Sequence, residues 1–495
     1  MNEQDRGRRP SGGRSMTERE RRLREIRRKK RRQRAIRNRI IFGVVLLILL
    51  ILIVLAVKAI AGAIGGSGSN AANTTPAADI SSSAADETSA AEETSAAEET
   101  AQAASDPLSQ AQLLAASYDY DGAIALSQTI PGYESDAQVT AAIAEWEQTK
   151  TTLVEVDIET IPHVFYHSLI VDPSKAFHND EARATDYNQV MTTVDEFNKI
   201  TQEMYNRGYV LVKIHDMAQN VDGTMQKGKI LLPADKKPFV LSIDDVSYYE
   251  YMTGDGFATK IVIGDDGYPT CEMQMDDGSV QTGGFDVVPL LEAFIKEHPD
   301  FSYKGARGII ALTGYDGILG YRTAPKYGDP STPEYQANDW YKDINVEQER
   351  ADATAVVARM KEVGWEFATH SWGHKDMGEA SYDNMVADME KWLDQVNPLL
   401  GGDTDIVIFP KGTDIGSWRG YDDNDKFEYL KSVGFDYYCN VDTNQPWVQF
   451  DSRYLRQARI NFDGYEMYYC QDKLAPFFDA DSVFDSSRPT PVKKM

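Results

Sequence analysis

Two short segments of the sequence carry residues that bind metal ions or move protons. Asp244 and Asp245 directly follow the apolar run 239–243, and His370 and His374 lie four residues apart further along the chain. Two histidines with one carboxylate make a three-ligand metal site that leaves a position open for water, which is typical of catalytic rather than structural sites. The other carboxylate is then free to act as a general base. Each motif alone is a weak signal, because adjacent aspartates are usually solvated and isolated histidine pairs are common.

The segments that must position these residues alternate between apolar strands and amphipathic helices from residue 154 onward. Adjacent carboxylates inside a strand point to opposite faces, whereas at the end of a strand both can reach one pocket. The repeated order of strand and helix predicts a parallel α/β sheet or barrel, with its chemistry at the carboxyl ends of the strands. The expected strands are 163–166, 209–214, 239–243, 308–312, 365–368 and 406–409, and the expected helices are 193–207, 287–298, 346–363, 382–400 and 426–433.

These motifs together resemble the polysaccharide deacetylases of carbohydrate esterase family 4, also called the NodB homology domain. Leu241–Val246 (LSIDDV) is similar to the family's first motif, Gly364–His374 (GWEFATHSWGH) to its second, and Phe409–Gly412 (FPKG) to its aromatic-Pro-Tyr-Gly run. Tyr166 and His167 resemble the subgroup that begins with a Tyr-His strand. The resemblance covers about residues 160–470. It implies an α/β fold that is a distorted (β/α) barrel.

The resemblance also implies a site. Asp245, His370 and His374 would bind a divalent metal ion, for which zinc is the default with two imidazoles and one carboxylate. Asp244 would be the general base. Such an ion polarises an acetyl carbonyl and lowers the pKa of its water, and an ionised aspartate beside it can accept the proton.

Further residues of the second motif and of the Phe409–Gly412 run are expected to bind substrate or to support the site. Trp372, Pro410 and Lys411 would line the substrate groove, although core packing is an alternative role for Trp372. A backbone N–H near Lys411 could stabilise the oxyanion that forms during hydrolysis. Ser371 is expected to hold its loop and the free ring nitrogen of a ligand histidine.

The sequence departs from the family pattern in three places. Val246 replaces a glycine, Lys411 replaces a tyrosine, and no histidine follows His374, so the family's late general-acid histidine is missing. His167 is the best substitute, because it lies at the end of the first expected strand, on the catalytic side. The alternative is that His167 is only a hydrogen-bonded residue at a strand end.

The N-terminal region predicts a membrane anchor. Residues 1–39 hold 17 Lys or Arg and 5 Asp or Glu, whereas the rest of the chain holds 34 and 72. Ile40–Val57 contains 18 residues without a charge, enough for roughly 27 Å of helix. The positive-inside rule then places residues 1–39 in the cytoplasm, a transmembrane helix at 40–64, and the catalytic domain outside the cell. A cleaved signal peptide is the alternative, and the basic tail could contact anionic lipid or RNA.

Three further segments complete the expected organisation. Residues 65–106, with their Ala/Glu/Ser/Thr repeats, are expected to be a disordered linker. Residues 107–153 resemble a tetratricopeptide-like helical segment, which is either a spacer or cap or binds a protein partner. Residues 154–495 form the expected catalytic domain, with an inserted β-hairpin over the site near 250–285 or, alternatively, a calcium loop there. The sequence leaves undecided whether Cys439 and Cys470 form a disulfide.

Composition excludes two classes of protein. At 42% hydrophobic residues the chain is not wholly disordered, and its acidic body with no basic stripe argues against nucleic acid as a partner. The favoured function is a metal-dependent hydrolase that removes acetyl groups, N-acetyl before O-acetyl, from a cell-wall or extracellular polysaccharide or peptidoglycan. The alternatives are a degenerate deacetylase-like domain that binds glycan, and a structural protein whose helical segment recruits partners.

Overall fold

The structure is a computed structural model that describes residues 106–442 and 445–495. The predicted basic tail, transmembrane helix and linker lie outside these residues, apart from Asp106, whose carboxylate caps the first described helix. Within the described part of the chain, no helix combines the length and the apolar character needed to cross a bilayer.

Seven parallel strands form a closed barrel, which confirms the predicted barrel architecture. They follow the order β11, β12, β13, β14, β16, β2 and β7, and β7 pairs with β11 to close the ring. Every residue of β2, β11, β12 and β13 is buried, as expected for strands covered on both faces. The barrel strands are β2 (His163–Tyr166), β7 (Lys237–Ile243), β11 (Ile309–Leu312), β12 (Glu366–Thr369), β13 (Ile406–Ile408), β14 (Tyr437–Val441) and β16 (Tyr454–Asn461).

The barrel is distorted where it closes. The first part of β7 pairs with an outer strand, β3 (Tyr209–Leu211), and only Ser242 and Ile243 pair with β11. The ring is therefore closed only at the carboxyl end of β7, directly before Asp244. β3 is shorter than the expected strand 209–214, because the Asp216 carboxylate accepts the Lys213 backbone N–H and the chain turns into the short helix α9 (Ile214–Met217).

Two barrel strands, β14 and β16, were not predicted. β16 contains charged residues that are completely or nearly buried, which hides it from any search for apolar alternation. Arg456 pairs with Asp414, and Arg459 pairs with Asp244. These partners lie 42 and 215 residues away in sequence, so nothing local marks the strand. β15 (Val448–Asp451) pairs with β16 in antiparallel orientation.

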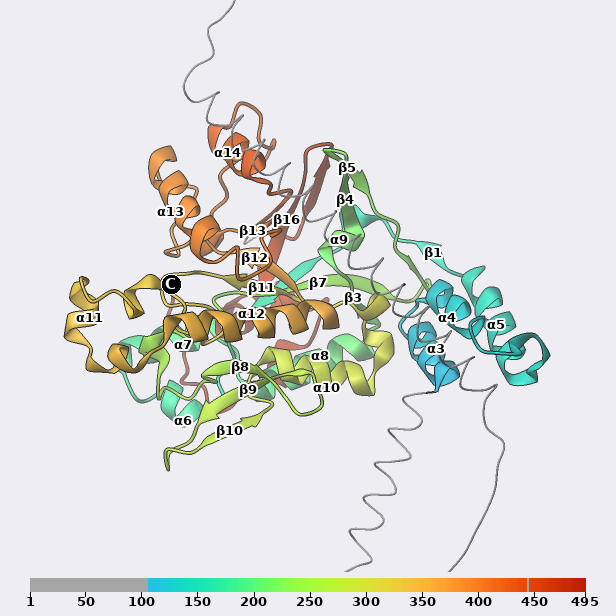
Figure 1. Cartoon of the computed structure of the whole chain (residues 1–495), viewed down its shortest axis with the longest axis horizontal. Coiled ribbons are helices and arrows are strands. Elements are labelled where there is room, and N and C mark those ends of the chain that lie inside the picture. Colours follow the sequence, from blue (N-terminus) through green and yellow to red (C-terminus); the bar gives the residue numbers. More distant parts are fainter. Residues whose placement is uncertain (1–105, 443–444) are drawn as a thin grey trace, which may run out of the picture. The chain divides into compact units, whose positions relative to one another are not determined.

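Helices cover the outside of the barrel, with α8, α10 and α12 visible beside the strands in Figure 1. α8 begins at a capping box in which Thr193 and Glu196 satisfy each other's backbone N–H groups. α12 ends at Gly364, whose φ of 120° only glycine adopts readily. The larger helices are α7 (Glu181–Val190), α8 (Val194–Asn206), α10 (Val287–Glu297), α12 (Val346–Val363), α13 (Tyr382–Gln395) and α14 (Asp425–Val433), and the shorter ones are α6 (Pro173–Ala176), α11 (Pro333–Ala337), α15 (Gly464–Tyr469), α16 (Gln471–Leu474) and α17 (Ala480–Val483).

Three helices, α3 (Pro107–Ala116), α4 (Tyr120–Ser127) and α5 (Ala137–Lys150), make up the segment before the barrel. They share a small apolar cluster that includes Ala111 and Trp146. Tyr118 joins this segment to the body, because its hydroxyl donates to the Asp300 carbonyl at 2.9 Å and its ring stacks on Tyr303. A protein partner for this segment stays a prediction.

The insertion near 250–285 is a three-stranded antiparallel sheet rather than a hairpin, formed by β8 (Lys260–Ile263), β9 (Pro269–Gln274) and β10 (Val280–Gly283). It packs on α10 and α12. Asp266 and Asp277 accept backbone N–H groups two residues further on, so these carboxylates shape turns. The smaller pairs are β1 (Val154–Glu155) with β6 (Leu231–Leu232), and β4 (Ala218–Val221) with β5 (Thr224–Lys227). All three cysteines are unpaired.

Candidate metal centre and active site

Asp245, His370 and His374 come together at the carboxyl end of the barrel. One possible ligand atom from each lies within 4.8 Å of the others, and His374 Nε2 lies 3.5 Å from Asp245 Oδ2. His370 Nδ1 lies 2.9 Å from the Ile408 carbonyl, which can only accept, so Nδ1 carries the proton and Nε2 keeps its lone pair. Burial lowers the pKa of His370, which favours the neutral ring that a metal ion requires. The donor set therefore fits a divalent ion.

The backbone at these residues leaves the extended conformation abruptly. Asp245, Ser371 and His374 have φ values of 59°, 59° and 50°, in the left-handed region that residues with a side chain rarely adopt. Such backbone strain concentrates at functional sites. At Asp245 the change ends the pleat of β7, so that Asp244 and Asp245 are not forced onto opposite faces.

A tyrosine supports the Asp245 carboxylate from behind. The buried hydroxyl of Tyr249 donates to Asp245 and lies 2.8 Å from Thr313 Oγ1. The Tyr249 ring stacks between Tyr251 and Tyr315, with centroid distances of 5.4 and 5.0 Å. Hydrogen-bonded partners of this kind orient metal ligands, and the sequence analysis did not identify Tyr249.

Asp244 is buried and held by an arginine fork. Arg459 on β16 donates from Nη1 to Oδ1 at 2.7 Å and from Nη2 to Oδ2 at 2.9 Å. Burial alone would raise the pKa of Asp244, but Arg459 and, to a lesser extent, His370 outweigh it and lower the pKa to about 2. Asp244 is therefore ionised at any physiological pH. No local signal marks Arg459 for this role, because Asp244 lies 215 residues away in sequence.

His167 lies at the same end of the barrel, directly after β2. Its Nδ1 lies 3.1 Å from the Val190 carbonyl, which can only accept, so the proton of the neutral ring is on Nδ1. His167 is close enough to contribute to the lowered pKa of both Asp244 and Asp245. It is also near Asp463, whose pKa burial raises to about 6.

Ser371 and Trp372 shape the loop that carries the two ligand histidines. Ser371 Oγ accepts the Lys375 N–H at 2.9 Å, whereas the ring nitrogen of His370 is held by a backbone carbonyl instead of by Ser371. The backbone N–H of Trp372 donates to the Asp388 carboxylate at 2.7 Å. The Trp372 ring packs so tightly on Gly314 that a Cβ there would lie 2.3 Å from it. This contact favours packing for Trp372, and substrate contact stays a prediction.

Pro410 and Lys411 follow β13, the strand next to β12. Pro410 is buried and Lys411 is exposed, with a φ of 59°. Gly412 allows close approach of β14, because a Cβ there would lie 2.5 Å from Val441 Cβ. The loop thus lies at the catalytic end of the barrel, as predicted, and presents the Lys411 side chain to solvent.

The family model for polysaccharide deacetylase matches residues 338–438, which include β12, both ligand histidines and Lys411. This stretch of the chain therefore resembles a polysaccharide deacetylase domain. Two solved structures are similar: a Streptococcus pyogenes deacetylase, PplD, in complex with acetate, and IcaB from Ammonifex degensii. They share 16% and 11% identity, each covers 62% of this chain and 93% or 94% of its own, and both have a TM-score of 0.32. A search of the curated proteins found no match.

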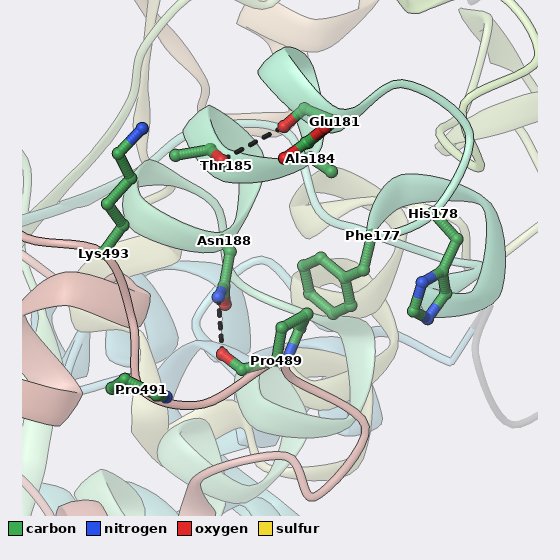
Figure 2. Close-up of a pocket in the computed structure, with 9 residues that line it drawn as sticks. All are labelled: Phe177, His178, Glu181, Ala184, Thr185, Asn188, Pro489, Pro491 and Lys493. Atoms are coloured by element: carbon green, nitrogen blue, oxygen red, sulfur yellow. Dashed lines mark hydrogen bonds between the residues drawn. The ribbon is translucent and has the colours of Figure 1, made fainter.

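Several residues of the candidate site lie outside the matched range. Asp244, Asp245, His167 and Arg459 reach the site only through the barrel fold. A pocket of about 360 Å³ lies elsewhere, between α7 and the C-terminal tail, and its lining includes none of these residues (Figure 2). The candidate site is therefore identified by its chemistry and not by the size of a cavity.

Proposed function

We propose that this protein is a metal-dependent hydrolase that removes acetyl groups from a cell-wall or extracellular polysaccharide or from peptidoglycan. The observation that carries the proposal is the group of Asp245, His370 and His374 beside the Asp244–Arg459 pair. This arrangement places a metal-type site next to an ionised carboxylate, in a chain that resembles a polysaccharide deacetylase over residues 338–438.

The two imidazoles and one carboxylate would hold the metal ion, and zinc is the default for this set. When bound, such an ion supplies Lewis acidity toward the acetyl carbonyl and lowers the pKa of water. The protein's own contribution is the fixed orientation of the ligands. His370 is held through its Nδ1 proton, and Asp245 is held by the Tyr249 hydroxyl.

Two side chains beside the three ligands carry the two proton transfers, one as base and one as acid. Asp244, kept ionised by Arg459, accepts a proton from the attacking water. His167 carries its ring proton on Nδ1 when neutral, so a second proton on Nε2 makes it an acid that can protonate the leaving group. In this proposal a backbone N–H near Lys411 stabilises the oxyanion.

The leaving group decides how strongly the enzyme depends on His167. An amine is a poor leaving group without protonation, whereas a sugar alkoxide depends on a proton less. Removal of a positioned acid costs about 10²- to 10⁴-fold. We therefore propose that N-acetyl groups are cleaved and that His167→Ala lowers the rate on an N-acetylated substrate far more than on an O-acetylated one.

The test is a pair of acetate-release rates, on N-acetylated chitooligosaccharide and on acetylated xylan, for the native protein and His167→Ala. A selective loss on the amide supports the proposal. Equal rates for both proteins on both substrates would remove His167 from the mechanism.

A second candidate is a degenerate domain that binds glycan without hydrolysing it. The absence of any histidine after His374 favours this candidate. Glycan binding by the native, metal-loaded protein without any release of acetate would establish it in place of the enzyme.

We further propose that the protein is a single-pass membrane protein, with the N-terminus in the cytoplasm and the catalytic domain outside. The basic residues 1–39 followed by the apolar run from Ile40 support this orientation. Protease added to intact cells should remove the catalytic domain and spare an N-terminal tag.

A further inference from the structure

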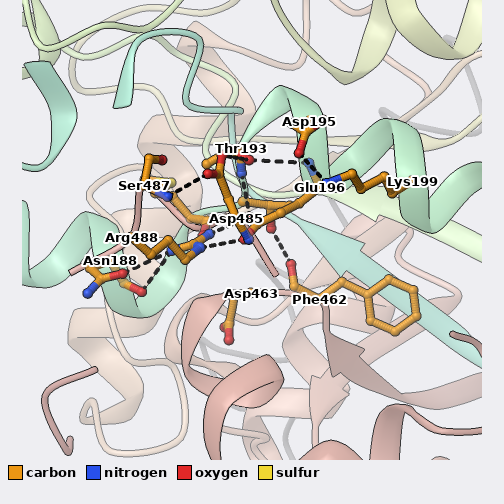
Figure 3. Close-up of polar contacts among 12 residues, drawn as sticks. Asn188, Thr193, Asp195, Glu196, Lys199, Phe462, Asp463, Asp485, Ser487 and Arg488 are labelled. Atoms are coloured by element: carbon orange, nitrogen blue, oxygen red, sulfur yellow. Dashed lines mark hydrogen bonds and ion pairs between the residues drawn. The ribbon is translucent and has the colours of Figure 1, made fainter. Parts of the chain in front are cut away.

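The C-terminal tail, residues 485–495, lies against α7 and the start of α8 (Figures 2 and 3). Asn188 Nδ2 donates to the Pro489 carbonyl at 2.8 Å, and Gln189 Nε2 donates to the Lys493 carbonyl at 2.7 Å. Because these bonds use carbonyl groups of the tail, they fix its backbone along the end of α7.

A fully buried ion pair, Arg488 with Glu196, forms the centre of this contact. Arg488 Nε and Nη2 donate to the two Glu196 carboxylate oxygens, each at 2.6 Å. Two buried charges cost desolvation energy that only complete hydrogen bonding offsets. Arg488 meets this requirement by donating also to the carbonyls of Met191, at 2.6 Å, and Asn188, at 3.1 Å. Figure 3 shows Arg488 between Asn188 and Glu196.

These two carbonyls flank the carbonyl of Val190, which holds His167. Arg488 therefore holds the end of α7 and the start of the turn to α8, on either side of the atom that accepts the His167 Nδ1 proton. Thr192 fixes the same turn from another direction, because its hydroxyl donates to the Phe462 carbonyl at the end of β16. The Thr192 carbonyl in turn accepts the Ile170 N–H at 2.9 Å.

We propose that Arg488 is a positioning residue for His167. By holding the Met191 and Asn188 carbonyls, the tail keeps the Val190 carbonyl where it fixes the tautomer and orientation of the His167 ring. The inference rests on the proposed function, in which His167 protonates the leaving group. The proposal means that Arg488, a tail residue that does not touch the site, helps to orient the histidine that protonates the leaving group.

A matched control is available at the other end of the barrel. Arg307 also forms a buried fork to a carboxylate, Glu292, with both bonds at 2.9 Å, and also donates to neighbouring carbonyls. Those carbonyls belong to Gly305 and Ala306, before the start of β11, and therefore lie away from the carboxyl ends of the strands. A general loss of stability should affect both arginine variants alike.

The first measurement compares Arg488→Lys with Arg307→Lys in the full chain, using acetate release from N-acetylated and O-acetylated substrates. Lysine keeps the charge but cannot reproduce the arginine fork. We expect Arg488→Lys to lower the amide rate about 10- to 100-fold, the cost of a small misplacement of a catalytic group. The ester rate should fall much less, and Arg307→Lys should leave the ratio of the two rates unchanged. An unchanged ratio in folded Arg488→Lys would overturn the proposal.

The second measurement does not depend on activity. In protein labelled with ¹⁵N-histidine, the His167 ring signals, assigned with His167→Gln, should report the Nδ1-protonated tautomer in the native chain and a mixture in Arg488→Lys. Identical signals in both proteins would count against positioning. If the native chain released acetate from neither substrate, the proposed function would fail while these ring signals still decided the positioning.

If Arg488→Lys does not fold, Thr192→Val takes its place. It removes only the hydroxyl that ties the turn to β16 and keeps the side-chain volume. The same selective loss on the amide is expected, with a smaller factor. No change in the amide-to-ester ratio in this variant would also overturn the proposal.

Discussion

The two ends of the barrel hold the same residue types in opposite states. β12 connects them, with Glu366 at its start and His370 directly after its end. At the amino end, both ring nitrogens of His215 are used: Nδ1 by Glu366 and Nε2 by Asp405, at 3.1 Å. At the carboxyl end, His370 uses Nδ1 for a carbonyl and keeps Nε2 among the ligand atoms.

The difference shows that residue type alone does not make a metal site. A histidine between two carboxylates is an imidazolium with no lone pair, so the amino end forms an ion-pair network that stabilises the fold. A histidine held by one carbonyl keeps a lone pair for a ligand. In parallel barrels the carboxyl end carries the chemistry and the amino end carries stability, and the hydrogen bonds of these two histidines follow that division.

The largest effect should come from the ligand histidines. His370→Ala and His374→Ala should each abolish hydrolysis. Each should also weaken the binding of a divalent ion by more than about 100-fold, because even the loss of a residue that only supports a ligand weakens metal binding by up to about that factor. Metal content and acetate release measure this. His215→Gln, at the other end, is the control and should keep both. Full metal occupancy and activity in the alanine variants would disprove the site.

Asp244→Asn should keep the metal ion and lose turnover by about 10²- to 10⁴-fold, because an amide cannot accept the proton. The variant leaves Arg459 without its carboxylate, so its folding must be checked by circular dichroism. Asp405→Asn, which alters the amino end, is the control. Native turnover in Asp244→Asn would show that Asp244 is no base.

Tyr249→Phe should weaken metal binding by about 10- to 100-fold, because it removes the hydroxyl that orients Asp245. Tyr248→Phe is a close match, since the buried Tyr248 hydroxyl donates at 2.6 Å to Asp286, which is not one of the three ligands. Calorimetric titration with zinc measures the metal affinity of the two variants. Equal affinities in both variants would argue that Tyr249 contributes only to packing.

The smallest expected effect is a pH-dependent loss of stability in His215→Gln, at the amino end of the barrel. Burial lowers the pKa of His215, but Glu366 and Asp405 outweigh it and raise the pKa well above its ordinary value. The charged histidine therefore contributes stability that is complete below about pH 6.5 and is lost as pH rises through the raised pKa. Because the His215 side chain is 36% exposed and solvent screens its ion pairs, His215→Gln should lower the free energy of unfolding by about 1 kcal/mol at pH 6, and by less at higher pH.

Urea unfolding of the native protein and His215→Gln at several pH values measures this contribution. Hydrolysis by the folded variant should be native at every pH. A difference in stability that grew with pH would mean that His215 is neutral in the folded protein.

The parts of the fold that could be predicted from the sequence are those with a local signal. Apolar runs and caps marked β2, β7, β12, α8 and α12 nearly to the residue, because burial and capping depend on neighbours in the chain. β16 could not be predicted, because Arg456 and Arg459 are buried as ion pairs with Asp414 and Asp244, which are distant in sequence. The helix expected at 382–400 ends at Gln395, ahead of Pro398, because a proline disfavours helical backbone before it.

The sequence by itself determined which residues could bind a metal ion, since the order of Asp-Asp and the His pair is written in the chain. The tertiary structure decided the states of these residues. Arg459 from β16 keeps Asp244 ionised, the Tyr249 hydroxyl secures Asp245, and the Val190 carbonyl at the end of α7 fixes the His167 tautomer. Hydrogen bonds and charges act over a few ångströms in space, and only the closed barrel brings these groups within that distance.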